Sequence, residues 1–194
     1  MNFIRADRAE TDLRPQLSHV FIEGFYSWVS YFHKDKVKLK ATFVHAFILP
    51  NFYVSMVDDE VAAMVACTQG YSPIQLDRKV FSKTLGLIRG NIAYFMLKRH
   101  MVRNSYPFTL SPKTGSIEFV ATAPNHRQKG IAHDLILHTM QNNPYDAYVL
   151  EVAGNNTNAL KLYEKLGFKE IKRIKAPRNS GVGSFLYMRR EMEQ

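Results

Sequence analysis

The sequence predicts an α/β (α+β) fold, in which a mixed sheet is flanked by helices. Two observations lead to this class. From residue 116 to residue 190, apolar runs suited to strands alternate with helical patterns in the order β-α-β-α-β-β. Before them, two helical patterns are followed by a hairpin pattern over residues 51–71. A length of 194 residues fits one domain over residues 1–194, in which residues 73–112 are a helical insertion.

The composition is that of a folded, basic protein. Hydrophobic residues make up 46% of the chain, which argues against disorder. Lys and Arg number 26 against 17 Asp and Glu, so the net charge of +9 favours an anionic ligand or partner. Neither a secretory signal nor an apolar stretch of membrane-spanning length is found, and the seven histidines lack metal-ligand spacing. We therefore expect a soluble, cytoplasmic protein without a metal, in which the single Cys67 is a buried, unreactive thiol.

The first part of the chain predicts a short strand, two helices and a hairpin. The strand covers residues 3–5, and a helical pattern follows it. One face of that helix is expected to hold Leu13, Leu17, Val20, Phe21, Gly24 and Trp28. A second helix is expected over residues 35–49, where Pro50 stops it. Two β-rich runs around the acidic turn "DDE" then predict the hairpin.

The insertion at residues 73–112 mixes apolar positions at helical spacing with basic residues. The favoured interpretation is a helix or helix pair that packs on the domain with its charges in solvent. The apolar positions are Phe81, Leu85, Ile88, Ile92 and Phe95. Gly86 and Gly90 predict a break in the helix. A lid, or a surface for an acidic partner, is the alternative.

The last part of the chain has the clearest pattern. Strands are expected at residues 116–122, 147–152, 168–174 and 184–190, and helices at 127–141 and 157–166. Apolar stripes at helical spacing support the helices. They consist of Ile131, Leu135, Ile136 and Met140 in the first, and of Ala159, Leu162, Tyr163 and Leu166 in the second. Gly167 is placed to end the second helix.

The stretch "NHRQKGIA", residues 125–132, predicts an anion site between a strand and a helix. The first amides of a helix have no acceptor within the helix, and the helix dipole makes this end positive. Gly130 allows close approach to the backbone, and Arg127 and Lys129 add positive charge. The pattern fits neither a Walker loop nor the three-glycine dinucleotide fingerprint.

A second motif, "LEVAGNNTNALKLYEKLGF" at residues 150–168, follows this loop. The pairing of R-x-x-G-x-A with N-x-x-A-x-x-L-Y-x-K-x-G-F, each after a strand, resembles the GCN5-related N-acetyltransferase (GNAT) superfamily, and the match covers residues 116–174. The resemblance implies a mixed, mostly antiparallel sheet of six to seven strands that splays between the fourth and fifth. It also implies acetyl-CoA as co-substrate.

The resemblance implies three groups of coenzyme contacts. The pyrophosphate would lie on the loop that consists of Arg127, Gln128, Lys129, Gly130, Ile131 and Ala132. The pantetheine arm would pair with the backbone of Phe119, Val120, Ala121 and Thr122 as an added strand does. Asn156 matches the asparagine that contacts the coenzyme, and it can also cap the helix that it begins.

Acetyl transfer to an amine needs a base, a proton donor for the thiolate and a donor for the oxyanion. The resemblance makes Tyr163 the general acid; a core aromatic is the alternative. Glu118 resembles the base of histone-type members, and Glu151 matches a glutamate of ribosomal-protein N-terminal acetyltransferases. Glu118 is favoured, and a structural acid in a salt bridge remains the alternative for both. A backbone N–H of residues 119–122 is the expected oxyanion donor.

The acceptor is expected to be a primary amine of a small molecule or a peptide. The resemblance points to "EGFYSWVSYFHKDK", residues 23–36, as its pocket. There Glu23 would attract the ammonium group, with Tyr26, Trp28 and Tyr31 facing it or packing in the core. The oligomeric state, monomer or homodimer, stays open.

Two rival functions remain. A regulatory or sensor domain could bind acyl-CoA on the same fold without catalysis. Alternatively, residues 78–113 could bind nucleic acid or a membrane surface. That second rival ranks lower because the segment lacks an aromatic and basic recognition motif.

Overall fold

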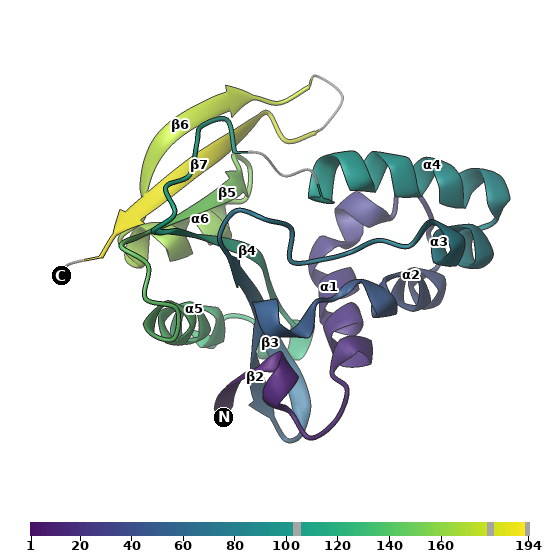
Figure 1. Cartoon of the computed structure of the whole chain (residues 1–194), viewed down its shortest axis with the longest axis horizontal. Coiled ribbons are helices and arrows are strands. Elements are labelled where there is room, and N and C mark those ends of the chain that lie inside the picture. Colours follow the sequence, from purple (N-terminus) through teal and green to yellow (C-terminus); the bar gives the residue numbers. More distant parts are fainter. Residues whose placement is uncertain (103–105, 178–180, 193–194) are drawn as a thin grey trace.

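The computed structural model describes residues 1–102, 106–177 and 181–192. Within these residues, seven strands form one sheet in the order β1-β2-β3-β4-β5-β7-β6 (Figure 1). The strands are β1 (Asn2–Arg5), β2 (Phe52–Val57), β3 (Glu60–Thr68), β4 (Thr114–Thr122), β5 (Ala147–Ala153), β6 (Lys169–Lys175) and β7 (Ser184–Glu191). Among these seven described strands, only β4 and β5 pair in parallel. The mixed, mostly antiparallel sheet is confirmed.

Helices cover both faces of this sheet (Figure 1). On one face lie α1 (Arg14–Val29), α2 (Lys36–Phe43), α3 (Arg78–Leu85) and α4 (Leu87–Leu97). On the other lie α5 (Ile131–Gln141) and α6 (Thr157–Lys165). Each face has its own apolar core. Phe21, Phe43, Phe52 and Phe81 belong to the first, and Ile131, Leu135, Tyr148 and Phe168 to the second.

The predicted hairpin of β2 and β3 is confirmed and turns at two acidic residues. Asp58 and Asp59 both have positive φ angles, of 49° and 63°. This backbone matches the right-handed twist of the flanking strands, which is why short polar residues are favoured in two-residue hairpin turns. Val57 and Glu60 close the ladder on either side.

Helix α1 follows the predicted face only in part. Leu17, Val20 and Phe21 are buried, as expected. Non-helical angles at Phe25 (φ −114°, ψ 16°) then kink the helix, and beyond the kink Val29 is buried but Trp28 is not. Trp28 is 51% exposed, so the prediction is wrong at this position.

Helix α2 ends six residues earlier than the sequence pattern suggests. Asp35 caps its start by accepting a hydrogen bond from the Val37 amide at 2.8 Å. After Phe43 the chain enters a 3-10 turn, and Phe47 then forms an antiparallel bridge with Ile74. Pairing with this distant segment draws the backbone into an extended form before Pro50 is reached.

The insertion forms the helix pair that was expected, with a break at Gly86 (φ 88°). Phe81 and Leu85 are buried as predicted. The other three apolar positions point to solvent, because α4 packs on α3 through a different stripe, composed of Gly90, Ala93 and Leu97. The predicted packing face is wrong at Ile88, Ile92 and Phe95, which are 77%, 52% and 56% exposed.

Helix α5 begins at Ile131 rather than at residue 127. The preceding residues form a 3-10 turn (Pro124–His126) and a loop that ends at Gly130, whose φ of 78° is left-handed. From there on, the whole predicted apolar stripe of α5 is buried. In α6, Tyr163 is buried and Ala159 and Leu162 are partly so, and Leu166, directly after the helix, is buried.

Candidate functional site

The main feature of the sheet is an opening between its two parallel strands. β4 and β5 pair only over residues 114–116 and 147–149, where Ser116 opposite Val149 is the last pair. Both strands continue, to Thr122 and Ala153. β4 remains paired with β3 up to Thr122, so it is the side toward β5 that opens. The predicted splay is confirmed.

A bulge in β4 lies within this opening. The register with β3 jumps from Ala66 opposite Glu118 to Met64 opposite Ala121. Phe119 has a φ of 50°, which is unfavourable for a bulky residue and needs support from its surroundings. Its ring packs against Phe21 and Phe25, with centroids 5.8 and 6.0 Å away. The aromatic core under α1 thus holds the backbone of β4 in an irregular form beside the opening.

The loop at residues 125–132 has the geometry of an anion site. Gln128 and Gly130 are both left-handed, with φ angles of 61° and 78°. The amide of Asp134 donates to the Gly130 carbonyl at 3.2 Å and makes the first bond of α5. The amides of residues 131–133 thus belong to the first turn, where they have no acceptor within the helix. Successive amides in such a turn form a concave donor set for a phosphate.

Arg127 has a structural task in addition to its charge. Its Nε donates to the Thr122 carbonyl and its Nη2 to the Glu23 carbonyl, both at 3.1 Å. The side chain therefore fastens the loop to the end of β4 and to α1. Lys129 and Gly130, which lie further along the loop, are exposed.

Asn156 caps α6, which was one of its two predicted roles. Its side-chain oxygen accepts a hydrogen bond from the Ala159 amide at 3.2 Å. The neighbouring Asn155 donates to the Gly181 carbonyl at 3.0 Å and so joins this loop to the one that precedes β7.

The two candidate glutamates lie on the same face of the sheet. Glu118 is opposite Ala66, which belongs to the core under α1. Glu151 is opposite Tyr187 of β7, on the face where Tyr106 packs. Paired residues in a ladder project to the same side. The structure therefore brings Glu118 and Glu151 to one side of the opening.

Two tyrosines that the sequence did not indicate, Tyr106 and Tyr187, lie near these carboxylates. The Tyr106 ring is 6.1 Å from that of Tyr187, and its hydroxyl is buried. Burial, together with the charges of Glu118 and Glu151, raises the pKa of Tyr106 well above its ordinary value. Burial and a hydrogen bond to Glu151 raise the pKa of Tyr187. Tyr106 comes from the irregular segment before β4, where no periodicity marks it.

Tyr163 lies on the opposite face. It belongs to the core under α5 and α6, and its ring is 6.0 Å from that of Phe168. Val120 of β4 and Val152 of β5 line the same core. Burial raises the pKa of Tyr163, so the phenol stays protonated at neutral pH. Both predicted interpretations, a proton donor and a core aromatic, are compatible with this position.

The predicted acceptor pocket is arranged differently from what was expected. The Glu23 carboxylate pairs with Lys36 at 2.6 Å and with Lys40 at 3.7 Å, and its side chain is only 15% exposed. Tyr26 donates to the Lys34 carbonyl. Tyr31 is exposed, whereas Trp28 packs on Phe185 of β7 with centroids 6.0 Å apart. The Glu23 carboxylate thus pairs with two lysines, and Trp28 reaches across to β7.

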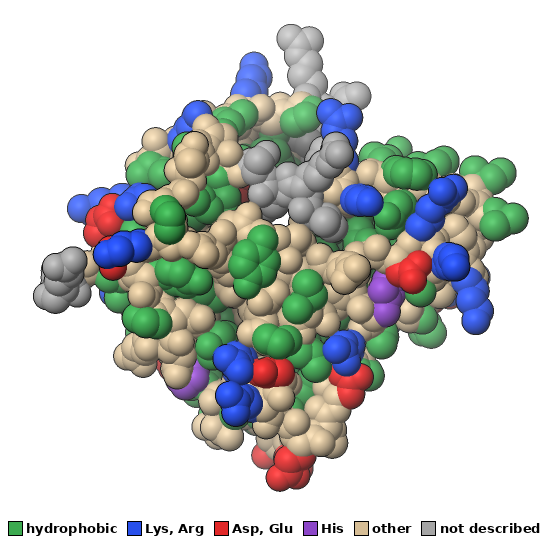
Figure 2. All heavy atoms as spheres, viewed as in Figure 1, with side chains coloured by type: hydrophobic (Ala, Val, Ile, Leu, Met, Phe, Trp, Pro, Cys, Tyr) green, Lys and Arg blue, Asp and Glu red, His purple; other side chains and the backbone are tan. Residues whose placement is uncertain are grey.

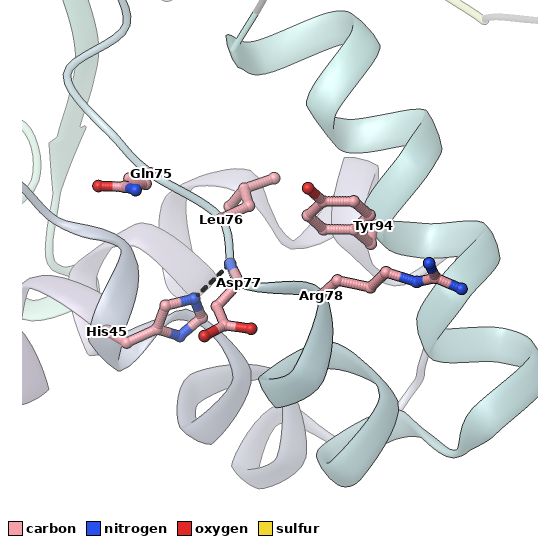
Figure 3. A pocket seen from close by; sticks show the side chains of 6 residues that line it. All are labelled: His45, Gln75, Leu76, Asp77, Arg78 and Tyr94. Atoms are coloured by element: carbon pink, nitrogen blue, oxygen red, sulfur yellow. Dashed lines mark hydrogen bonds between the residues drawn. The ribbon is translucent and has the colours of Figure 1, made fainter.

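A separate hollow of about 430 Å³ lies at the start of α3 (Figure 3). It is lined by His45, Gln75, Leu76, Asp77, Arg78 and Tyr94. His45 accepts a hydrogen bond from the Asp77 amide at 2.9 Å through Nε2, which fixes the segment before α3 against the turn after α2. Burial lowers the pKa of His45, so its ring is neutral. None of the lining residues belongs to β4 or β5.

Cys67 is buried, as expected, and burial raises the pKa of its thiol to about 12. Within the described ranges, no three His, Cys, Asp or Glu side chains gather as ligands of a metal ion would. No helix in the same part of the chain has the length and apolar character needed to cross a membrane.

Comparison with known proteins identifies the family. A family model described as "Acetyltransferase (GNAT) family" matches residues 19–168, which include the opening, the loop and α6. The chain belongs to the GNAT acetyltransferase family. The resemblance found in the two motifs is confirmed.

Individual relatives are more distant. An N-alpha-acetyltransferase of Saccharolobus solfataricus is 36% identical over 81 residues, which are 40% of this chain and 48% of that protein. The match therefore spans about half the length of this curated relative. Among solved structures, a ribosomal-protein-alanine N-acetyltransferase from Brucella melitensis has a TM-score of 0.61 at 13% identity, covering 99% of this chain and 100% of that one. An N-acetyltransferase from Staphylococcus aureus has a TM-score of 0.60 at 17% identity, with 97% and 100% covered. These structures share the fold of the GNAT proteins.

Proposed function

We propose that this protein is an N-acetyltransferase that moves an acetyl group from acetyl-CoA to a primary amine. The observation that carries the proposal is the position of the opening between β4 and β5, which lies directly before the left-handed loop at the start of α5. An acyl thioester with a long arm and a pyrophosphate needs both features side by side.

The donor contacts that we propose are mostly backbone contacts. The pyrophosphate lies on the amides of residues 127–132, where the Gly130 backbone is open and left-handed. The arm pairs with residues 119–122 of β4, beyond the last pair with β5. Asn156 contacts the coenzyme with the part of its amide that does not cap α6. The residues present fit this co-substrate.

The reaction is a direct transfer in a ternary complex. The neutral amine attacks the carbonyl carbon of the thioester, a C–N bond forms, and the C–S bond then breaks. A carboxylate takes the proton that the amine loses, and Tyr163 returns a proton to the sulfur. The raised pKa of Tyr163 supports this role, since the phenol holds its proton until the thiolate forms. A backbone N–H of residues 119–122 donates to the oxyanion.

Glu118 and Glu151 are both suited to the role of base. They lie on the face that α1 covers, and the charges of both contribute to the raised pKa of the buried Tyr106 phenol. Glu118 is on β4, directly before the segment proposed to hold the arm, and this favours it. Glu151 is on β5, outside that segment, and accepts a hydrogen bond from Tyr187.

The first acceptors to test are amino termini of peptides. The name of the Saccharolobus relative, N-alpha-acetyltransferase, and that of the Brucella structure both refer to such substrates. Small amines form the second set.

A second candidate, a non-catalytic acyl-CoA sensor, is favoured by one observation. Tyr163 lies in the apolar core, on the side of the sheet away from the two glutamates. Two measurements separate the candidates: isothermal titration of acetyl-CoA, and release of free thiol from acetyl-CoA with and without a panel of peptide and small amines. Amine-dependent release supports the enzyme. Tight binding of acetyl-CoA without release for any amine supports the sensor, and absence of binding contradicts both.

A further inference from the structure

Helix α4 is apolar on two opposite sides, although only one side faces the protein. Gly90, Ala93 and Leu97 pack inward. The outward side carries Leu87, Ile88, Ile92, Phe95 and Met96, which are 39–77% exposed. We call these five residues the α4 patch. A helix that is apolar all round is normally buried, so the exposed side of α4 indicates a contact outside the domain.

The sequence that contains the patch is rich in positive charge. From residue 78 to residue 117 the sequence contains eight Lys and Arg and no Asp or Glu. They are Arg78, Lys79, Lys83, Arg89, Lys98, Arg99, Arg103 and Lys113. This stretch therefore holds most of the excess behind the net charge of +9. Figure 2 shows hydrophobic side chains gathered over α4 with Lys and Arg side chains beside them.

Two of these basic residues contact the rings of α4 directly. The Arg78 guanidinium lies 5.2 Å from the centroid of the Phe95 ring. Lys98 lies 5.4 Å from the Tyr94 ring, and its Nζ is 3.1 Å from the Tyr94 hydroxyl. Apolar and cationic groups are thus interleaved on one surface. This is the arrangement of a helix that lies in the interface of an anionic membrane.

We propose that the α4 patch and its basic surround dock on an anionic lipid surface. The helix has eleven residues, too few to span a bilayer but enough to lie along its surface. In this arrangement the patch enters the boundary between headgroups and acyl chains, while Lys and Arg meet lipid phosphates. The docking is independent of acetyl transfer and requires no coenzyme.

Other occupants fit less well. A second copy that used the same patch around a twofold axis would bring two mainly basic surfaces together. Nucleic acid would satisfy the charges but would leave the aliphatic side chains of Leu87, Ile88 and Ile92 without a partner.

The test measures co-sedimentation of the whole protein with vesicles, at about 0.1 M salt. Vesicles of phosphatidylcholine alone are compared with vesicles of equal parts phosphatidylcholine and phosphatidylglycerol. We expect binding to the mixed vesicles only, weakening as salt rises. The double variant Ile88→Ser, Phe95→Ser should lower the partition coefficient about tenfold or more, since two exposed apolar side chains no longer enter the interface.

The variants are chosen so that the fold survives. Ile88 and Phe95 are exposed, so their replacement removes no core contact. Lys83→Gln combined with Arg89→Gln should weaken binding roughly tenfold through the charges alone. Ile171→Ser is the matched control, because Ile171 is 48% exposed on β6, outside the patch, and binding should not change.

Three outcomes would overturn the proposal. They are equal binding to neutral and mixed vesicles, unchanged binding of the Ile88 and Phe95 double variant, and no binding to either vesicle. In the last case, sedimentation velocity of the wild type and the double variant would identify a dimer, and a DNA mobility assay would identify a nucleic-acid surface. Because the vesicle assay contains no acetyl-CoA, its failure would leave the proposed transfer reaction untouched.

Discussion

The Arg127 side chain donates a hydrogen bond to the Glu23 carbonyl across 104 positions of sequence, at 3.1 Å, and so ties the loop before α5 to α1. Its second bond, to the Thr122 carbonyl, fixes the end of β4. Arg127 thus joins the three segments that surround the proposed donor site.

The first prediction follows from these two hydrogen bonds of the Arg127 guanidinium. Arg127→Lys keeps the charge but cannot make both bonds, so the Kd for acetyl-CoA should rise about tenfold, nearly as much as in Arg127→Gln. Isothermal titration of acetyl-CoA measures it. Lys129→Gln, at a neighbouring position of the loop, is the comparison for charge alone. Full rescue by Arg127→Lys would show that charge matters and the two carbonyl contacts do not.

The second prediction concerns the left-handed Gly130. A Cβ at this position would meet no atom within 4 Å, but the φ of 78° is strained for any other residue. Gly130→Ala should therefore cost about 1 kcal/mol of stability and also weaken acetyl-CoA binding, because the added methyl group lies where a phosphate must approach.

The matched control is Gly183→Ala, which has nearly the same φ (77°) and equally open space. Gly183→Ala should lower the free energy of unfolding in urea by the same amount as Gly130→Ala, with no change in the Kd for acetyl-CoA. Equal affinity in the two variants would mean that the loop at residues 125–132 does not hold the coenzyme.

Sequence reasoning reached most of the fold because the elements around the site obey local rules. Near the site, such local patterns are the helical spacing of Leu135, Ile136 and Met140 and the glycine just before α5. The bulge at Phe119 and the burial of Tyr106 depend on aromatic contacts with distant segments, and no local pattern carries them. The outward side of α4 was misassigned for a related reason, since helical spacing marks an apolar stripe but does not say what it packs on.

The third prediction separates the candidate acid and bases. Tyr163→Phe and Glu118→Gln should each lower kcat by a factor of about 10² to 10⁴, as expected when a positioned acid or base is removed. Glu151→Gln should have the smaller effect. Steady-state kinetics at matched pH, with the acceptor that the amine panel identifies, measure all three variants.

Tyr145→Phe is the control for loss of a phenol, since Tyr145 lies before β5 and packs on Tyr148. Its kcat should equal that of the wild type. If Tyr163→Phe and Glu118→Gln also keep the wild-type kcat, the assignment fails, and a Glu151→Gln effect larger than that of Glu118→Gln would move the base to Glu151.

The fourth prediction is a loss of stability in mild acid through His45. Burial lowers the pKa of this ring below the ordinary 6.5, so the unfolded chain takes up the proton at a higher pH than the folded protein does. The stability that the neutral His45 ring allows is fully present above pH 6.5. It is lost as the pH falls from 6.5 through the lower pKa that His45 has in the folded protein. The wild-type Tm should therefore drop between neutral pH and mild acid.

His45→Gln can still accept the Asp77 amide bond but does not titrate. Its Tm should be lower than that of the wild type at neutral pH and should change less over the same interval. An equal slope in both proteins would assign the acid sensitivity to other groups.

The last prediction concerns the contact between α3 and α4. A Cβ at Gly90 would lie 2.2 Å from the Phe81 carbonyl oxygen, and backbone atoms cannot move aside as a flexible side chain can. Gly90→Ala should therefore lower the free energy of unfolding by about 1–3 kcal/mol, although alanine is the better helix former. Urea unfolding measures the change. Ile92→Ala, on the exposed side of the same helix, should stay within about 0.5 kcal/mol of the wild type. A stability gain in Gly90→Ala would mean that α4 lies further from the Phe81 carbonyl oxygen than the 2.2 Å from a Cβ at Gly90 implies.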